Sequence, residues 1–343
     1  RMARPGEFTR RAFDAGKLDL TAVEGLADLI AADTESQRRQ ALRQMEGAQG
    51  KLYESWREAI VRAMALAEAD IDFSDQDLPG ALSAESRRTM EFLLAEMRRH
   101  LGDSHRGERV RAGIHVAILG PPNVGKSTLL NALAKREAAI VSEIPGTTRD
   151  VIEVALDLAG FPVLLADTAG LRSTPDSIER EGVRRALERG RAADFAILVL
   201  DPSTVGDADT IEGNPLSAQT IVIINKKDTP DGRSAPDSVG GIPVLKVSAK
   251  TGEGLDSLVT LIKSMIESRF GGAEDLGPAI TRSRHRELLE SCAGHLDRAL
   301  AAEADELAAE DLRLAARALG AITGRVDVES ILDVIFRDFC IGK

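Results

Sequence analysis

The fold of this chain is decided by the stretch Gly120-Pro121-Pro122-Asn123-Val124-Gly125-Lys126-Ser127, which directly follows the apolar run Ile114–Leu119. Its spacing matches the phosphate-binding pattern GxxxxGK[ST], in which glycines let backbone N–H groups turn toward a phosphate and the following helix points its positive end there. We expect Lys126 to reach the β- and γ-phosphates and the Ser127 hydroxyl to bind Mg²⁺. Because run, loop and helix come in the required order, a glycine turn without a ligand is the weaker interpretation. The predicted phosphate-binding residues are Asn123, Val124, Gly125, Lys126, Ser127 and Thr128.

The base of the nucleotide is specified further along the chain. Asn225-Lys226-Lys227-Asp228 follows the apolar run Ile221–Ile224, and Ser248-Ala249-Lys250 follows the run Val244–Val247. The Asp228 carboxylate would accept two hydrogen bonds from guanine, whereas adenine presents no donors there and would leave the carboxylate unpaired. A backbone N–H of the second segment would contact guanine O6. We therefore predict that GTP is the ligand and that it is bound through Asn225, Lys226, Asp228, Ser248, Ala249 and Lys250.

Two further segments are expected to respond to the γ-phosphate. Thr147 and Thr148 would offer a hydroxyl to Mg²⁺ and an N–H to the γ-phosphate, with Thr148 as the predicted Mg²⁺ ligand. The second segment is Asp167-Thr168-Ala169-Gly170, which would place Asp167 near the Mg²⁺ and the Gly170 N–H near the γ-phosphate. Hydrolysis would remove these contacts and release both segments.

The residue after this second segment restricts the mechanism of hydrolysis. Ras-like enzymes carry a water-orienting Gln there, whereas this chain carries Leu171, which cannot orient a water. Another group must then position the attacking water, and the candidates are Asp176, Glu179 and Glu181. For Glu179, the residue pattern alone favours an exposed helix carboxylate over a catalytic group.

Around these motifs, between about residues 111 and 270, short apolar and β-branched runs alternate with helical stretches. The runs are Ile114–Leu119, Val151–Leu158, Val163–Ala166, Phe195–Leu200, Ile221–Ile224 and Val244–Val247. Such alternation predicts an α/β domain with a mixed, mostly parallel sheet. The run Val151–Leu158 alternates apolar and polar residues and meets the next run through the short turn Ala159–Gly160, so we predict an antiparallel edge strand.

The flanking residues 18–110 and 271–343 carry apolar residues at helical spacing. One stripe consists of Trp56, Ile60, Met64, Leu66 and Ala67, and a second consists of Leu288, Leu289, Cys292, Leu296 and Leu300. The segment Asp70–Gly80 interrupts the first flank, and another helix follows through Met90, Leu93, Leu94 and Met97. Because the flanks are too short to form two bundles, we predict one all-α helical domain into which the α/β P-loop GTPase domain, residues 111–270, is inserted.

Composition limits the classes of function. The 343 residues carry a net charge of −11, which excludes a generic polyanion binder and requires a local basic patch for any nucleic-acid contact. No run of about 18 apolar residues occurs, so we predict neither a membrane span nor a signal peptide. Cys292 and Cys340 are too few for a disulfide framework, which favours a reducing cytoplasm. The start at Arg1, in the middle of a motif, predicts a fragment without its natural N-terminal region.

Both ends of the chain carry more specific motifs. Arg4-Pro5-Gly6-Glu7-Phe8 and Gly16-Lys17-Leu18-Asp19-Leu20 lie near the start, and Phe339-Cys340-Ile341-Gly342-Lys343 ends the chain. With these ends and the order of the nucleotide motifs, the whole chain closely resembles the MnmE (TrmE) family of tRNA-modification GTPases. The resemblance identifies residues 1–17 as the remnant of an N-terminal domain that binds a tetrahydrofolate derivative and dimerises.

The resemblance also implies partners and site residues. Members of the family act in the cytoplasm as homodimers with an FAD-dependent partner, MnmG, and add a carboxymethylaminomethyl-type group at carbon 5 of the wobble uridine of tRNA; no DNA partner is implied. K⁺ would be bound by Asn123 between two GTPase domains, in the place of an arginine finger. Glu179 matches the water-positioning glutamate of the family. Cys340 is assigned to the modification chemistry, and Lys343 to folate binding.

Some assignments stay open at this level. A small buried apolar residue is an equal interpretation of Cys340. Two other functions compete with tRNA modification, namely a regulatory GTPase of ribosome assembly or signalling, and a structural helical scaffold with a degenerate nucleotide domain. The flanking helices and the C-terminal motif favour tRNA modification over the regulatory GTPase. The intact set of nucleotide motifs conflicts with the structural scaffold.

Two groups of basic side chains are candidates for contact with an anionic partner. A group near the second flank fits a solvated helix face better than a tRNA contact; it consists of Arg282, Arg284, His285 and Arg286. A group at the start has a positive balance that suits folate or tRNA, and it consists of Arg1, Arg4, Arg10 and Arg11. The five His residues lack the spacing of metal ligands, so no zinc site is predicted.

Overall fold

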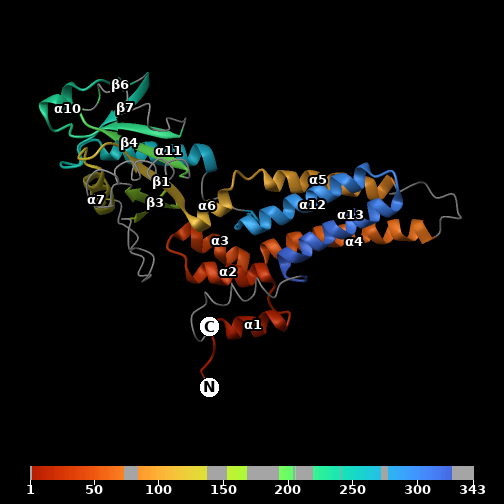
Figure 1. The fold of residues 1–343 in the computed structure, drawn as a ribbon. Helices are drawn as coiled ribbons and strands as arrows, with labels where there is room; N and C mark the ends of the chain where they lie inside the picture. The colour runs from red at the N-terminus through yellow and green to blue at the C-terminus, as the bar shows by residue number, and fades with distance from the viewer. Residues whose placement is uncertain are drawn as a thin grey trace, which may run out of the picture. The chain divides into compact units, whose positions relative to one another are not determined.

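The computed structural model describes residues 2–72, 84–136, 153–167, 193–203, 205, 219–239, 241–271 and 277–326. The chain divides into two compact units. The helical unit comprises Arg1–Arg111 and Asp275–Lys343, and the α/β unit comprises Ala112–Glu274. An α/β unit is therefore inserted between two sequence segments of an all-α unit, which confirms the predicted fold class (Figure 1).

The α/β unit contains a seven-stranded sheet with the strand order β2-β3-β1-β4-β5-β7-β6. The strands are β1 (Ile114–Leu119), β2 (Glu153–Leu158), β3 (Phe161–Asp167), β4 (Phe195–Leu200), β5 (Thr220–Ile224), β6 (Ser238–Val239) and β7 (Ile242–Lys246). The helices described in this unit are α7 (Lys126–Arg136), α10 (Pro230–Ser234) and α11 (Leu255–Phe270). Only the edge strands β2 and β6 run antiparallel to their neighbours, so the sheet is mixed and mostly parallel, as predicted.

The burial of the strands explains why they could be recognised. All six residues of β4 are buried, and in β1 only His115 is exposed. Continuous apolar runs of this kind are typical of parallel strands with both faces covered. The predicted hairpin between β2 and β3 is also present, and its turn residues Ala159 and Gly160 both have positive φ, 56° and 81°. Such a two-residue turn matches the right-handed twist of the two strands.

The last helix of the α/β unit is fastened to the middle of the sheet by aromatic contacts. The ring of Phe270 in α11 lies 6.2 Å from that of Phe161 in β3 and 6.1 Å from that of Phe195 in β4. The neighbouring Arg269 guanidinium lies 5.5 Å from the Phe195 ring centroid and donates a hydrogen bond to the Asp194 carbonyl at 2.8 Å. These contacts attach α11 to strands β3 and β4 of the sheet. The residues that make them lie outside the phosphate-binding loop in the sequence.

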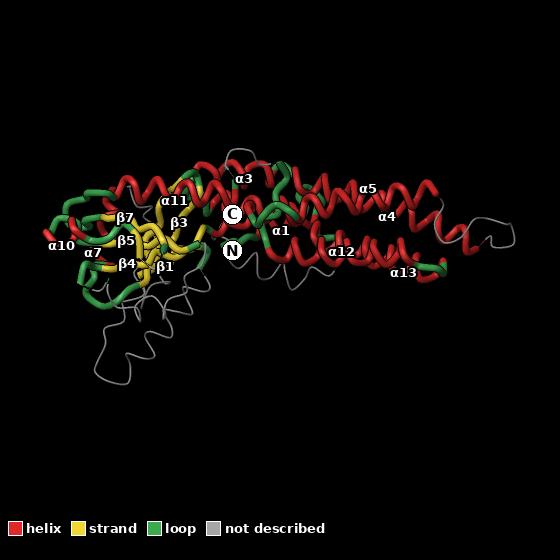
Figure 2. Tube along the Cα trace, turned by 90° about the horizontal axis from the view of Figure 1, so that it is seen from above, coloured by secondary structure: helices red, strands yellow, loops and turns green. Residues whose placement is uncertain are grey.

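The helical unit is built from two sequence segments that pack together. Its helices are α1 (Glu7–Asp14), α2 (Leu20–Ile30), α3 (Glu35–Met45), α4 (Ala48–Asp72), α5 (Ala84–Leu101), α6 (Arg106–Ala112, which ends at the boundary between the units), α12 (Ser283–Ala301) and α13 (Asp305–Thr323). Helices α4 and α5 from the first segment lie beside α12 and α13 from the second (Figures 1 and 2). Both flanks therefore share one apolar core, as predicted.

The predicted apolar stripes face this core, with one exception. Trp56, Ile60 and Ala67 are buried and Met64 is half-buried, whereas 49% of the Leu66 surface is exposed. The prediction is wrong for Leu66 because its position is about 100° away from that of Ala67 around the helix and falls outside the buried stripe. In the second stripe, three residues are fully buried and two pack at the margin of the core; in order these are Leu289, Cys292, Leu296, Leu288 and Leu300.

The two segments of the helical unit are also tied together where the insertion begins and ends. Arg111 Nε and Arg282 Nη2 both donate to Asp28 Oδ1, each at 2.9 Å. A Cβ on Gly107 would lie 2.4 Å from the Ile280 carbonyl oxygen, so only glycine permits this approach of the two segments. In the described ranges, no helix combines the length and apolar character that a bilayer crossing requires.

Candidate nucleotide-binding site

The phosphate-binding loop lies between the end of β1 and the start of α7. Gly120 has φ 139°, and a Cβ there would lie 2.1 Å from the Val199 carbonyl oxygen of β4. Gly125 has φ 97°, and a Cβ there would lie 2.4 Å from Asn225 Nδ2. Both glycines of the motif are therefore required by backbone conformation and by space, which explains why the loop can turn its N–H groups inward.

The side chains of the loop have distinct environments. Lys126, the first residue of α7, is buried and donates from Nζ to the carbonyl oxygens of Gly120 and Pro121, both at 2.7 Å. Its ammonium therefore lies inside the loop, at the positive end of the helix. Ser127 is exposed on the first turn of α7, and Asn123 is exposed with φ 64°. A hydroxyl and a carboxamide oxygen at these positions are hard ligands that suit Mg²⁺ and K⁺.

Asn225 joins three loops of the site. Its Nδ2 donates to the Val124 carbonyl at 2.8 Å, and its Oδ1 accepts from the Ala249 N–H at 2.9 Å. The side chain is buried, so both hydrogen bonds are made away from water. The phosphate-binding loop and the two predicted base-binding segments are thereby held together. The Ala249 N–H, one of the donors expected for guanine O6, is occupied by this contact.

The predicted base-recognising carboxylate is oriented by the neighbouring loop. Ser248 Oγ donates to Asp228 Oδ1 at 2.7 Å and accepts from the Thr251 N–H at 3.1 Å. The hydrogen bond from Ser248 holds the pKa of Asp228 below its usual value. A carboxylate that is ionised at neutral pH can act as the double acceptor that guanine requires.

One residue of this region was not singled out by its sequence pattern. Asp201 follows β4, and its Oδ2 accepts from Lys226 Nζ at 2.6 Å. Burial would raise the pKa of Asp201, but the hydrogen bonds from Lys226 and Ser203 outweigh it and hold that pKa below its usual value. The available signal was the position of an acidic residue directly after a parallel strand, where ligand-binding side chains gather.

Site residues that the structure describes meet at one edge of the sheet. Because β1, β3, β4 and β5 run in parallel, the residues that follow them lie at their shared carboxyl ends. This edge carries Gly120, Asp167, Asp201 and Asn225. The predicted residues Thr147, Thr148, Thr168, Ala169, Gly170, Leu171, Asp176, Glu179, Glu181, Cys340 and Lys343 lie outside the described residues.

Comparison with known proteins decides the family. The family model described as the MnmE helical domain matches residues 20–340. The tRNA modification GTPase MnmE of Parvibaculum lavamentivorans is 57% identical over 348 residues, which cover 100% of this chain and 77% of the relative. The chain belongs to the MnmE family of tRNA modification GTPases.

Two other MnmE relatives agree with this assignment. The tRNA modification GTPases MnmE of Paramagnetospirillum magneticum and Rhodospirillum rubrum are 54% and 52% identical to the chain. Each covers 100% of this chain, which in turn covers 77% and 75% of their lengths. The resemblance read from the motifs at the two ends of the chain is thus confirmed.

The basic group of the second flank, Arg282, Arg284, His285 and Arg286, does not lie on the solvated helix face that was predicted for it. His285 is 0% exposed and Arg286 is 7% exposed, so a solvated helix face is wrong for both. His285 Nε2 lies 2.8 Å from Glu24 Oε2, and Arg284 Nη2 donates to Glu24 Oε1 at 3.1 Å. Arg282 forms ion pairs with Glu24 and Asp28, while Arg286 donates to Asp103 Oδ1 at 2.6 Å and pairs with Glu108. The group forms ion pairs inside the helical unit rather than a patch for tRNA phosphates.

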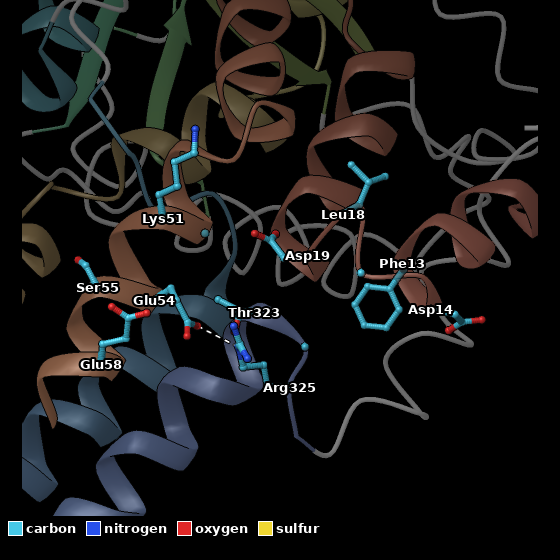
Figure 3. A pocket seen from close by; sticks show the side chains of 13 residues that line it. Phe13, Asp14, Leu18, Asp19, Lys51, Glu54, Ser55, Glu58, Thr323 and Arg325 are labelled. Carbon is cyan, nitrogen blue, oxygen red and sulfur yellow. Dashed lines mark hydrogen bonds and ion pairs between the residues drawn. The ribbon is translucent and has the colours of Figure 1, made fainter. Parts of the chain in front are cut away.

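The motif Gly16–Leu20, on which the MnmE resemblance partly rests, borders a cavity of the helical unit. This cavity has a volume of about 700 Å³ and is lined by the end of α1, the connection between α1 and α2, the first part of α4 and the end of α13 (Figure 3). Its acidic lining residues are Asp14, Asp19, Glu54 and Glu58, and its basic ones are Lys51 and Arg325. Because carboxylates outnumber cations, the cavity is a poor site for the phosphates of tRNA.

Within the described ranges, no cluster of three or more His, Cys, Asp or Glu side chains is placed to hold a metal ion.

Proposed function

We propose that this chain binds GTP with Mg²⁺ and hydrolyses it to drive the modification of carbon 5 of the wobble uridine in tRNA. In this proposal it acts in the cytoplasm as a homodimer together with an FAD-dependent protein of the MnmG type, and a tetrahydrofolate derivative supplies carbon. The observation that carries the nucleotide part is the double hydrogen bond of Asn225, which holds the phosphate-binding loop beside the base-binding segments. Membership of the MnmE family supports the tRNA part.

The chemistry of hydrolysis is a phosphoryl transfer, which depends on position and on neutralisation of charge. Lys126 would bind the β- and γ-phosphates at the positive end of α7, where its ammonium already lies. Ser127 and Thr148 would hold Mg²⁺, and Asn123 would hold K⁺ where two GTPase domains meet. The two cations, when bound, neutralise negative charge on the phosphates. With Leu171 in place of a Gln, Glu179 would orient the attacking water.

Turnover in different salts tests the GTPase part of the proposal. We expect faster GTP hydrolysis in KCl than in NaCl at matched ionic strength, because Na⁺ is too small for an oxygen cage of K⁺ size. Glu179→Ala should lower kcat and leave nucleotide affinity nearly intact, since Glu179 would contact only the water. The nearby acidic residues supply matched controls, Asp176→Ala and Glu181→Ala, which should keep their turnover. Equal rates in both salts would remove K⁺ from the proposal, and normal turnover in Glu179→Ala would remove Glu179.

Analysis of tRNA nucleosides tests the remaining part. Cells that lack the protein should lose the modified wobble uridine, as measured by mass spectrometry of digested tRNA. The full-length protein should restore it, whereas its Cys340→Ser variant should hydrolyse GTP normally but fail to restore it. The matched control is Cys292→Ser, because burial raises the pKa of the Cys292 thiol to about 12 and keeps it unreactive. Unchanged wobble uridine in the deleted cells would favour a regulatory GTPase instead.

A further inference from the structure

An aspartate buried directly after β4 forms an ion pair with a lysine in the predicted base-binding segment. Asp201 is 7% exposed and follows Leu200, the last residue of β4. Its Oδ1 accepts hydrogen bonds from the Ser203 N–H at 3.0 Å and from Ser203 Oγ at 2.5 Å. Its Oδ2 accepts from Lys226 Nζ at 2.6 Å. Ser203 fixes one oxygen of the carboxylate and leaves the other directed to the lysine.

The backbone of Lys226 is held as firmly as its side chain. Its φ of 64° is unusual for a lysine, and its carbonyl oxygen accepts from the Thr229 N–H at 3.0 Å and from Thr229 Oγ1 at 2.8 Å. A Cβ on Gly232 would lie 2.2 Å from the same oxygen, so the chain is closely packed there. The Lys226 side chain is therefore fixed at both ends, at its backbone and at its ammonium.

The part of Lys226 between these two fixed ends is available for contact. The Lys226 side chain remains 43% exposed although its ammonium is paired with Asp201, whose side chain is only 10% exposed. Lys226 stands in sequence between Asn225, which binds the phosphate-loop carbonyl of Val124, and Asp228, the predicted guanine acceptor. A lysine stem held at both ends and partly exposed offers an apolar surface to a planar ligand while its charge stays satisfied.

We propose that Asp201 is a positioning residue for the guanine nucleotide, which it stabilises by holding the stem of Lys226 against it. This inference rests on the proposed function, since it requires that the site bind GTP and GDP. A lysine without its partner samples many rotamers, and fixing it again on each binding event lowers affinity. The effect should therefore appear as faster nucleotide release, because most differences in affinity between related complexes lie in the dissociation rate.

A merely structural role of Asp201 predicts a different pattern. If the carboxylate only supported the end of β4, its loss would act through stability and would not depend on Lys226. A second buried aspartate at the opposite end of the same strand provides the matched control. Asp194 directly precedes β4, is 5% exposed, and accepts from the His115 N–H at 3.0 Å through Oδ2. It lies away from the carboxyl edge of the sheet.

The experiment measures the release of GDP carrying a fluorescent N-methylanthraniloyl group by stopped flow, together with thermal unfolding. Asp201→Asn should release this nucleotide roughly tenfold faster than the unchanged protein, which corresponds to the loss of one fixed charged contact. Asp194→Asn should leave the release rate unchanged. The preference for guanine over xanthine nucleotides should stay the same in Asp201→Asn, because that preference depends on Asp228.

A double-mutant cycle decides whether the effect passes through Lys226. In the Lys226→Met background, adding Asp201→Asn should not accelerate release any further. Unchanged release in Asp201→Asn alone, or an equal acceleration in the Lys226→Met background, would overturn the inference while the proposed function stands. If the unchanged protein fails to bind the labelled GDP, both the proposed function and the role of Asp201 are overturned.

Discussion

Two buried polar side chains, Glu24 of the helical unit and Asn225 of the α/β unit, find their partners in different ways. In the helical unit the carboxylate of Glu24, only 1% exposed, is surrounded by Arg282, Arg284 and His285. In the α/β unit the buried side chain of Asn225 is neutral and bonds to backbone groups of two other loops. A buried charge depends on opposite charges nearby, whereas a neutral amide can join loops without fixing any charge. Glu24 thus gathers opposite charges within the helical unit, whereas Asn225 holds three loops of the nucleotide site together without adding a charge there.

The largest effect should follow from breaking the charged cluster of the helical unit. Glu24→Ala would leave buried cations without their partner, and such a loss destabilises a protein by about 3–5 kcal/mol. The free energy of unfolding from urea titration measures it. The matched control is Glu35→Ala, because Glu35 pairs with Arg38 and Arg39 but is half exposed. Equal destabilisation by the two variants would show that burial of the cluster does not matter.

The next effect concerns the Asp228 carboxylate, which Ser248 orients in the α/β unit. Asp228→Asn replaces an acceptor with a donor that faces the donors of guanine, and GTP affinity should fall roughly 100-fold. Affinity for xanthosine triphosphate should rise. Calorimetric titration with both nucleotides measures the change. The adjacent Lys227→Gln is the control and should keep the preference for GTP; unchanged GTP binding by Asp228→Asn would place the base elsewhere.

The charged cluster around Glu24 should make the stability of the helical unit sensitive to acid. Burial would raise the pKa of Glu24, but His285, Arg282 and Arg284 lower it from 4.5 to about 2. A folded-state pKa below the unfolded one gives stability that is full above pH 4.5 and is lost as the pH falls toward 2. By pH 3 the loss should be about 2 kcal/mol, measured as the difference in unfolding free energy between pH 5.5 and pH 3.

This pH dependence has a direct check. Glu24→Gln should show a smaller loss of stability between pH 5.5 and pH 3 than the unchanged chain, because it has no carboxylate to protonate. Burial also lowers the pKa of His285, which acts in the same direction but at higher pH. A loss of the same size in Glu24→Gln would assign the acid sensitivity to other carboxylates.

The smallest effect should come from removing the hydroxyl that orients Asp228. Ser248→Ala removes the donor at 2.7 Å and the acceptor of the Thr251 N–H, and a single neutral hydrogen bond contributes about 1 kcal/mol. GTP affinity should fall roughly fivefold, with the preference over xanthosine triphosphate retained. The same titration measures it, with Ser257→Ala in α11 as a control outside the site. A loss as large as that of Asp228→Asn would mean that Ser248 touches the base itself.

The difference between the units also determines how much could be predicted from the sequence. The limits of β1 and β4 are those predicted, because continuous apolar runs between turns are unambiguous when both faces of a strand are buried. The phosphate-binding loop was recognised because its residue types lie at fixed spacing within eight positions. Strand β6 was missed, since two residues are too few to carry a period. β7 spans Ile242–Lys246 rather than Val244–Val247; its first two residues pair with β6, a strand that was not predicted.

The charged cluster could not be predicted in this way. Glu24 and His285 are separated by 261 positions, and nothing in either neighbourhood indicates the other. A run of basic residues reads the same in the sequence whether acidic side chains or water surround it in the fold. For the same reason the pairing of Asp201 with Lys226, 25 positions apart, became visible only once β4 and β5 were aligned. Local spacing reveals loops that bind ligands, and only the fold reveals partners that are distant in sequence.

The shared contact of Arg111 and Arg282 with Asp28 bears on how the helical unit tolerates an inserted domain. The helical unit holds the two sides of the insertion together by its own contacts, so it does not depend on the inserted residues for that closure. The entropy of closing a loop grows only with the logarithm of its length, so each doubling of the insert costs about 0.6 kcal/mol more. The host fold can therefore accept an insert of very different size at nearly the same stability. Because Asp28 binds both Arg111 and Arg282, the α/β unit can be replaced without opening this contact. A short linker between the two segments should therefore be as compatible with the helical unit as an inserted enzyme domain.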